Sequence, residues 1–179
     1  MESKIYLRAL ELEDYKTTVQ WRNDDDIWKM VTGPKYFVSS EYERVWIIKA
    51  INNPNELRLG ICLKENGKLI GLASMIKIDT VNRNGVFSIM IGEKEYWSGG
   101  HGFDAIKLLA DYCFNERGME RIWAPILKSN LSSQRLAEKC GAKIEGVLRK
   151  SIYKDGAFHD QVIVAVLKED YLKFIAKSQ

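Results

Sequence analysis

The sequence contains few of the residues that form disulfides and metal sites. It has 3 cysteines and 2 histidines in 179 residues. Cys62, Cys113 and Cys140 are odd in number, lie far apart and include no CxxC pair, which argues against a disulfide framework and against a zinc site. We therefore expect three reduced cysteines in the core and a functional site without a metal.

Long apolar runs and a strong charge of one sign are also missing. No stretch approaches the ~20 apolar residues needed to span a bilayer, and the first residues lack the apolar segment of a secretion signal. The 27 basic and 24 acidic residues give a net charge of +3 and are scattered without a basic run. We therefore expect a cytoplasmic protein that binds no membrane and does not have nucleic acid as its main ligand.

What the chain does contain is enough apolar residues for a buried core. Hydrophobic residues make up 46% of the sequence, and the length fits a single domain over residues 1–179. Apolar spacing and turn residues predict a strand at 4–10, one or two helices within 11–30, a helix at 41–51, and strands at 57–64, 68–78 and 85–91. Glu65, Asn66 and Gly67 are typical of a hairpin turn, so the middle of the chain is predicted to be an antiparallel meander.

Strands and helices alternate in the second half. The patterns predict a helix from the Gly-rich turn at 99 to about 117, a strand at 121–126, a helix at 132–139, strands at 143–153 and 157–167, and a helix at 169–176. Pro125 cannot donate to a sheet ladder, so we expect it at a strand end or a distortion. The simplest assembly is an α/β fold with one twisted mixed sheet of about seven strands flanked by helices.

The segment IMIGEKEYWSGGHGFDA, residues 89–105, is the most informative part of the chain. An apolar strand runs through a short turn into glycines and directly into an amphipathic helix. N–H groups at a helix start are unpaired and glycines allow a pyrophosphate to come close, so the segment suits anion binding. It is neither a nucleotide P-loop nor a GxGxxG fingerprint. A tight turn without a ligand is the alternative for so short a match.

Two segments and the residues after them resemble the motifs of one family. The W-G-x-G-x-G/A-x-E-A signature of GNAT acetyltransferases is matched by Trp97, Gly100, Gly102, Asp104 and Ala105, with Ser98 in place of the usual glycine. The family's N-x-x-S-x-x-x-x-E-K-x-G-F motif is matched by Asn130, Ser133, Glu138, Lys139 and Gly141. Its E-G-x-x-R and D-G-x-x-x-D endings are matched by Glu145, Gly146, Arg149, Asp155, Gly156 and Asp160. The sequence is thus similar over almost its whole length to GNAT N-acetyltransferases, most of all to the RimJ/RimL type.

The resemblance implies a GNAT-like fold and an N-acetyltransferase that uses acetyl-CoA, bound where two parallel strands splay apart. The pantetheine would bond to the backbone of Met90, Ile91 and Gly92. The pyrophosphate would meet Trp97, Ser98, Gly99, Gly100, His101, Gly102 and Phe103. Asn130 would contact the pantetheine, and Ser133 would protonate the leaving thiolate. Alternatively, Asn130 and Ser133 only cap and satisfy the first turn of the following helix.

The family's usual acid and bases are absent from their positions. Ala137 stands where many relatives have a proton-donating tyrosine, and Phe87 and Ile152 stand where relatives have carboxylates. Neutralising an alkyl ammonium of pKa ~10.4 at pH 7 costs ~4.6 kcal/mol, against about 1 kcal/mol for an α-amine near ~7.8. We therefore expect direct attack on the thioester by a low-pKa amine, that of an amino sugar or a peptide N-terminus, without a covalent enzyme intermediate. A polyamine or other small amine is the alternative acceptor, and a non-catalytic acyl-CoA sensor is the alternative function.

Four residues are candidates for binding the acceptor: Trp21, Arg22, Phe87 and His159. Trp21 and Arg22 belong to a W-R-N segment similar to that of some amino-sugar acetyltransferases, and the arginine could hold an acceptor phosphate or carboxylate. Trp21 could instead belong to the core, and Arg22 could pair with Asp25 or Asp26. The aspartates at 24–26 could face a polyamine or only form a solvated helix start. A homodimer is a further expectation for a small enzyme of this kind.

Overall fold

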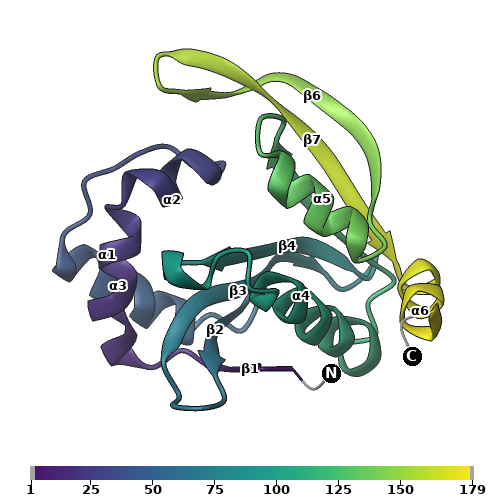
Figure 1. The fold of residues 1–179 in the computed structure, drawn as a ribbon, viewed down its shortest axis with the longest axis horizontal. Coiled ribbons are helices and arrows are strands. Elements are labelled where there is room, and N and C mark those ends of the chain that lie inside the picture. Colours follow the sequence, from purple (N-terminus) through teal and green to yellow (C-terminus); the bar gives the residue numbers. More distant parts are fainter. Residues whose placement is uncertain (1–2, 178–179) are drawn as a thin grey trace.

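The computed structural model describes residues 3–177, which form a seven-stranded mixed sheet (Figure 1). The strand order is β1-β2-β3-β4-β5-β7-β6, and every neighbouring pair is antiparallel except β4 and β5, which are parallel. The strands are β1 (Ile5–Ala9), β2 (Leu57–Leu63), β3 (Leu69–Asp79), β4 (Asn84–Ile91), β5 (Arg121–Leu127), β6 (Lys143–Lys154) and β7 (Ala157–Leu167). This confirms the predicted fold class and the antiparallel meander in the middle of the chain.

Helices flank the sheet. They are η1 (Leu12–Asp14), α1 (Tyr15–Arg22), α2 (Asp25–Met30), α3 (Ser40–Ile51), η2 (Lys94–Tyr96), α4 (His101–Asp111), η3 (Tyr112–Glu116), α5 (Leu131–Lys139) and α6 (Lys168–Lys177). Helix α4 packs against β1, β3 and β4 and contributes Ala105, Leu109 and Ala110 to the main core. Figure 1 shows α1, α2 and α3 together on one side, with the β6/β7 hairpin arching over α5 toward them.

Two helix starts follow directly from their capping residues. The Ser39 hydroxyl accepts a hydrogen bond from the Tyr42 N–H at 3.1 Å, so α3 begins at Ser40. The Asp24 carboxylate accepts from the N–H groups of Asp26 and Ile27 at 2.9 and 3.2 Å, so α2 begins at residue 25. The Asp24 cap separates α1 from α2, so the region 11–30, predicted to hold one or two helices, contains two α-helices.

The helix predicted from the Gly-rich turn to about residue 117 changes character before its end. Its α-helical part ends at Asp111 and is followed by a π-helical turn, η3. The Arg117 N–H donates to the Tyr112 carbonyl at 3.1 Å, five residues back. This wider turn keeps Cys113 and Phe114 both buried.

All three cysteines are buried and unpaired, which confirms the prediction made for them. Within residues 3–177, none of the helices is both long enough and apolar enough to cross a membrane.

Candidate functional site

Strands β4 and β5 are paired over three residues and then separate. Residues 84–86 of β4 pair with residues 121–123 of β5. Beyond Val86, β4 continues to Ile91 along β3, whereas β5 continues to Leu127 along β7. The parallel pair therefore splays apart in the middle of the sheet, as the family resemblance implies.

Pro125 lies inside β5, two residues beyond the last one paired with β4, and not at a strand end. The Arg121 N–H donates toward the β4 side, to the Arg83 carbonyl, while the Lys128 N–H donates toward the β7 side, to the Asp160 carbonyl. Because backbone groups alternate along a strand, Pro125 takes a position that faces β4, where it has no N–H to donate. The distortion predicted at this proline is the strand separation itself.

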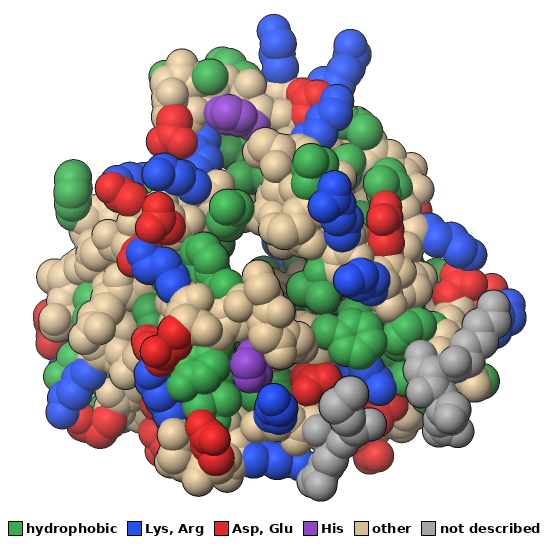
Figure 2. Space-filling model, viewed as in Figure 1, with side chains coloured by type: hydrophobic (Ala, Val, Ile, Leu, Met, Phe, Trp, Pro, Cys, Tyr) green, Lys and Arg blue, Asp and Glu red, His purple; other side chains and the backbone are tan. Residues whose placement is uncertain are grey.

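The separation opens a cleft with mainly apolar walls. Its walls come from β4, β5, β7, α4, α5 and the segment that follows α2, and it encloses about 880 Å³, including space open to solvent. The apolar lining includes Phe87, Ile89, Ala124, Ile126, Leu136 and Val164, and the polar side chains are Thr32, Ser88, Asn130 and Ser133. The space-filling view in Figure 2 is hollowed at its centre. Among the described residues, no charged side chain lines the cleft.

The free edge of β4 presents backbone groups to this cleft. The Gly92 N–H donates to the Ile70 carbonyl of β3 at 2.8 Å, so alternation directs the backbone groups of Phe87, Ile89 and Ile91 away from β3 and toward the gap. Of the residues expected to bond the pantetheine, Ile91 therefore directs its backbone groups toward the cleft, while Met90 and Gly92 direct theirs toward β3. The Ile91 carbonyl accepts from the Trp97 indole N–H at 2.8 Å.

The Gly-rich turn ends in an open helix start. Ser98 and Gly100 have φ values of 62° and 85°, and α4 begins directly after Gly100. A Cβ atom added at Gly100 would meet nothing within 4 Å. The His101 ring lies 3.2 Å from the Tyr96 carbonyl oxygen and packs edge-on against the Tyr96 ring, so this side chain braces the turn. The unpaired N–H groups of the first turn then remain for an anion, which fits the pyrophosphate predicted here.

Asn130 caps α5 and is 7% exposed. Its Oδ1 accepts from the Ser133 N–H at 3.1 Å and from the Ser132 hydroxyl at 2.8 Å, and its Nδ2 donates to the Met30 carbonyl at 3.0 Å. The capping role considered for Asn130 is present, and its side chain is engaged within the protein. Ser133 is half-buried on the cleft wall.

Trp21 and Arg22 do not line the cleft. Trp21 is 4% exposed, and its indole N–H donates to the Glu93 carboxylate at 2.9 Å. Arg22 pairs with the buried carboxylate of Glu43 at 3.4 Å and lies over the Trp46 ring, rather than pairing with Asp25 or Asp26. Both side chains thus hold α1 against its neighbours.

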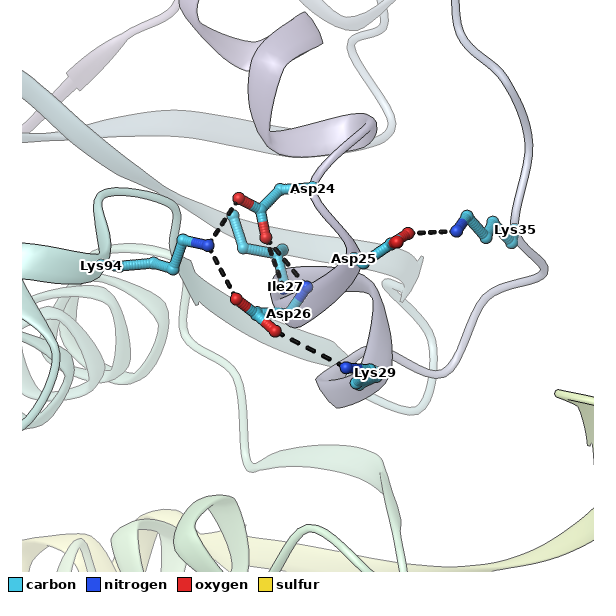
Figure 3. Close-up of polar contacts among 7 residues, drawn as sticks. All are labelled: Asp24, Asp25, Asp26, Ile27, Lys29, Lys35 and Lys94. Carbon is cyan, nitrogen blue, oxygen red and sulfur yellow. Dashed lines mark hydrogen bonds and ion pairs between the residues drawn. The ribbon is translucent and has the colours of Figure 1, made fainter.

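The aspartates at 24–26 are each paired with a lysine, and none of them lines the cleft (Figure 3). Lys94 contacts both Asp24 and Asp26 at 2.8 Å, while Asp25 pairs with Lys35. The hydrogen bond from Lys94 is the main cause that holds the pKa of the Asp24 carboxyl below its ordinary value. Asp24 and Asp26 thus tie the start of α2 to η2, which follows β4.

Phe87 lines the cleft, whereas His159 does not. His159 is half-buried in β7, and its Nε2 lies 3.0 Å from the Lys154 carbonyl oxygen. It fills a sheet position, the alternative role for a histidine before Asp160. No group of three or more His, Cys, Asp or Glu side chains within residues 3–177 is arranged to hold a metal ion.

Cys140 is the one cysteine on the cleft wall within the described residues. Burial raises the pKa of its thiol to about 12, so the thiol stays protonated at neutral pH and is a poor nucleophile. This agrees with a reaction that has no covalent enzyme intermediate.

Some cleft residues had no sequence signal that would have identified them. Met30, Val31 and Thr32 lie at the end of α2 and directly after it, and they reach the cleft through the tertiary packing of this segment. Ser88 could have been inferred, because it follows Phe87 at the predicted separation of the strands.

A family model described as an acetyltransferase (GNAT) domain matches residues 4–143. The chain is 29% identical to a probable N-acetyltransferase YjcK of Bacillus subtilis, over 93% of this chain and 95% of the relative. It is 27% identical to a spermidine N(1)-acetyltransferase of Vibrio cholerae, over 96% and 98% of the two chains. A crystal structure of the Vibrio cholerae spermidine N-acetyltransferase in complex with CoA and spermine has a TM-score of 0.88 at 26% identity, covering 96% of this chain and 99% of that one.

Proposed function

Because the chain belongs to the GNAT acetyltransferase family, and so is an enzyme that transfers acetyl groups from acetyl-CoA to amines, we propose that its acceptor is a polyamine or a similar small primary amine. The main structural support for the acetyl-transfer site is the separation of β4 and β5, beside the open start of α4. The acceptor class is supported by relatives from Vibrio cholerae and Escherichia coli that are named spermidine N(1)-acetyltransferases. They favour this alternative over the amino-sugar or peptide acceptor, and the RimJ/RimL subtype stays a prediction.

Acetyl-CoA would lie along the gap between the two strands. The Ile89 and Ile91 backbone groups would bond its pantetheine arm, and the Trp97 indole would release the Ile91 carbonyl as the arm enters. The first turn of α4 would hold the pyrophosphate. The thioester would then sit among Phe87, Ala124 and Ser133, where apolar walls exclude water.

Within the described part of the chain, the cleft offers hydroxyl groups for the proton transfers and no side-chain base. Its polar side chains are Thr32, Ser88, Asn130 and Ser133, and Asn130 is occupied as a cap. Deprotonating an alkyl ammonium at pH 7 costs ~4.6 kcal/mol. Because no side chain of the cleft described here can take this proton, it would leave through water in the open part of the cleft. Catalysis would then depend on aligning the amine with the thioester and on Ser133 protonating the thiolate.

The second candidate acceptor is an amine on a negatively charged molecule, such as the amine of a sugar nucleotide. No carboxylate lines the cleft within residues 3–177, whereas a polyamine would gain from carboxylates that pair with its other ammonium groups. The exposed β6 strand carries Arg149 and Lys150, which would attract a negatively charged acceptor.

Release of the CoA thiol in the presence of different amines tests the proposed function. We expect release with spermidine or spermine at rates well above hydrolysis, and little release with a UDP-amino sugar or with N-terminal peptides. Release with the sugar nucleotide alone would replace the proposal with the second candidate. Tight CoA binding without release for any amine would contradict an acetyl-transfer role.

Replacing Ser133 by alanine tests its role as proton donor. We expect kcat to fall about tenfold or more, with a small change in the acceptor KM, because the hydroxyl acts on the leaving group rather than on the amine. Ser132→Ala removes the neighbouring hydroxyl, which bonds to Asn130, and is the matched control. An equal fall in kcat for both variants would assign the effect to the α5 cap instead.

A further inference from the structure

Lys154 is a buried lysine at the end of β6, and it has no ion-pair partner within the described part of the chain. It is 7% exposed. Its ammonium donates to the carbonyl oxygen of Trp28 and, at 2.7 Å, to that of Val31, and it lies 4.5 Å from the centre of the Trp28 ring. Burial lowers the pKa of this ammonium, which the neighbouring Asp155 opposes. A buried cation normally has a carboxylate partner, so the two carbonyls and the ring have to replace one.

One of the two carbonyls that Lys154 binds, that of Val31, belongs to a wall of the cleft, while the other, that of Trp28, lies in the last turn of α2 just before it. Residues 30–32, here called the wall segment, line the cleft but are part of no strand, and α2 ends at Met30. The last carbonyls of a helix have no partners within the helix, so a lysine side chain can satisfy them. Asn130 holds the Met30 carbonyl as well, from the start of α5. Two side chains that are distant in sequence thus hold the wall segment.

The backbone of Lys154 is fixed independently of the wall segment. Lys154 pairs with Ala157 across a tight turn in which Asp155 and Gly156 have φ values of 50° and 77°. Its carbonyl oxygen lies 3.0 Å from the His159 ring. The contact therefore joins the turn of the β6/β7 hairpin to the end of α2, two elements that lie next to each other at the upper left of Figure 1.

We propose that Lys154 is a positioning residue for the acceptor, which acts by holding the wall segment against the cleft. This inference rests on the proposed function. Lys154 does not line the cleft, so it contacts neither reacting group. Without Lys154, Val31 of the wall segment and Trp28 of α2 would each lose a hydrogen bond, and Asn130 would be the remaining side chain described here that holds the segment. This wall of the cleft would then move outward. The amine would then be less well aligned with the thioester.

Replacing Lys154 by methionine keeps the length of the side chain and its contact with Trp28 but removes the donors. We expect the acceptor KM to rise about tenfold, the loss typical of one hydrogen bond to a charged group, with a smaller change in kcat and an unchanged Kd for acetyl-CoA. Lys154→Arg should restore most of the acceptor affinity, because a guanidinium can donate to both carbonyls. Lys173→Met removes an exposed lysine of α6 and should change none of these values.

Amide hydrogen exchange in the absence of any acceptor separates this inference from the proposed function. In K154M we expect faster exchange in residues 28–33, with unchanged exchange in β4 and α4. Should K154M fold poorly, the same comparison is made with K154L, which also lacks a donor. Unchanged exchange and an unchanged KM in either variant would overturn the positioning role. Faster exchange with no turnover of any amine would leave the contact standing and reject the proposed function.

Discussion

Gly100→Ala is expected to weaken acetyl-CoA binding by about tenfold to a hundredfold, the loss of one or two hydrogen bonds to a charged group. Gly100 has a φ of 85° directly before α4. Alanine resists this left-handed conformation at a cost of about 1–2 kcal/mol. The turn would relax and move the first N–H groups of α4 away from the pyrophosphate. Isothermal titration with acetyl-CoA measures the change.

The added methyl group itself would clash with nothing, since no atom lies within 4 Å of its position. Gly67→Ala is therefore a matched control: Gly67 has a φ of 73°, lies in the β2–β3 turn, and a Cβ there meets only the Tyr6 hydroxyl oxygen at 3.7 Å. Both variants should lose similar unfolding free energy, but only G100A should lose affinity. Equal acetyl-CoA affinity in the two variants would show that the pyrophosphate does not use the start of α4.

Trp21→Ala is expected to lower the free energy of unfolding by about 3–5 kcal/mol, the usual cost of removing a buried aromatic side chain. Trp21 packs so closely under the end of β4 that a Cβ added at Gly92 would lie 2.0 Å from its ring. Its indole N–H also stabilises the charged form of Glu93. Burial raises the pKa of that carboxyl, but the hydrogen bonds from Trp21 and Lys68 outweigh this effect and keep the pKa below its ordinary value. Urea unfolding measures the loss.

Two further variants separate this structural role from acceptor binding. Trp21→Phe keeps the packing and loses the bond to Glu93, so it should cost about 1 kcal/mol and leave the acceptor KM unchanged. Phe37→Ala removes a ring that is 98% exposed and should change stability by less than about 0.5 kcal/mol. A raised acceptor KM in W21F, with normal stability, would instead place Trp21 at the acceptor.

The parts of the fold that depend on local signals could be predicted from the sequence. Glu65, Asn66 and Gly67 connect β2 and β3 as expected, and the turn at 154–156 connects β6 and β7. The glycines before α4 also lie where their pattern placed them. These features require only turn chemistry and a change of apolar period, which neighbouring residues determine.

Contacts between distant segments could not be predicted in this way. Arg22 has two aspartates within a helical turn, yet it pairs with Glu43 of α3, because the packing of α1 on α3 buries that carboxylate beside it. The bond from Lys154 to Val31 joins residues 123 positions apart. Matching individual residues to the positions of a family motif therefore says little about which side chains surround the acceptor, because those side chains come from distant segments.

Pro125 has a consequence for how the site is maintained when it is empty. Two adjacent strand edges in one sheet normally close up, since each new hydrogen bond brings the next pair into register. Here the ladder between β4 and β5 would have to pass through a residue without a donor, directly opposite the free edge beside Phe87. Hydrogen bonding between β4 and β5 therefore cannot extend past Pro125. A ligand that enters the space between the two strands displaces solvent and does not have to break hydrogen bonds between β4 and β5. Its binding free energy is therefore not reduced by the cost of separating the strands.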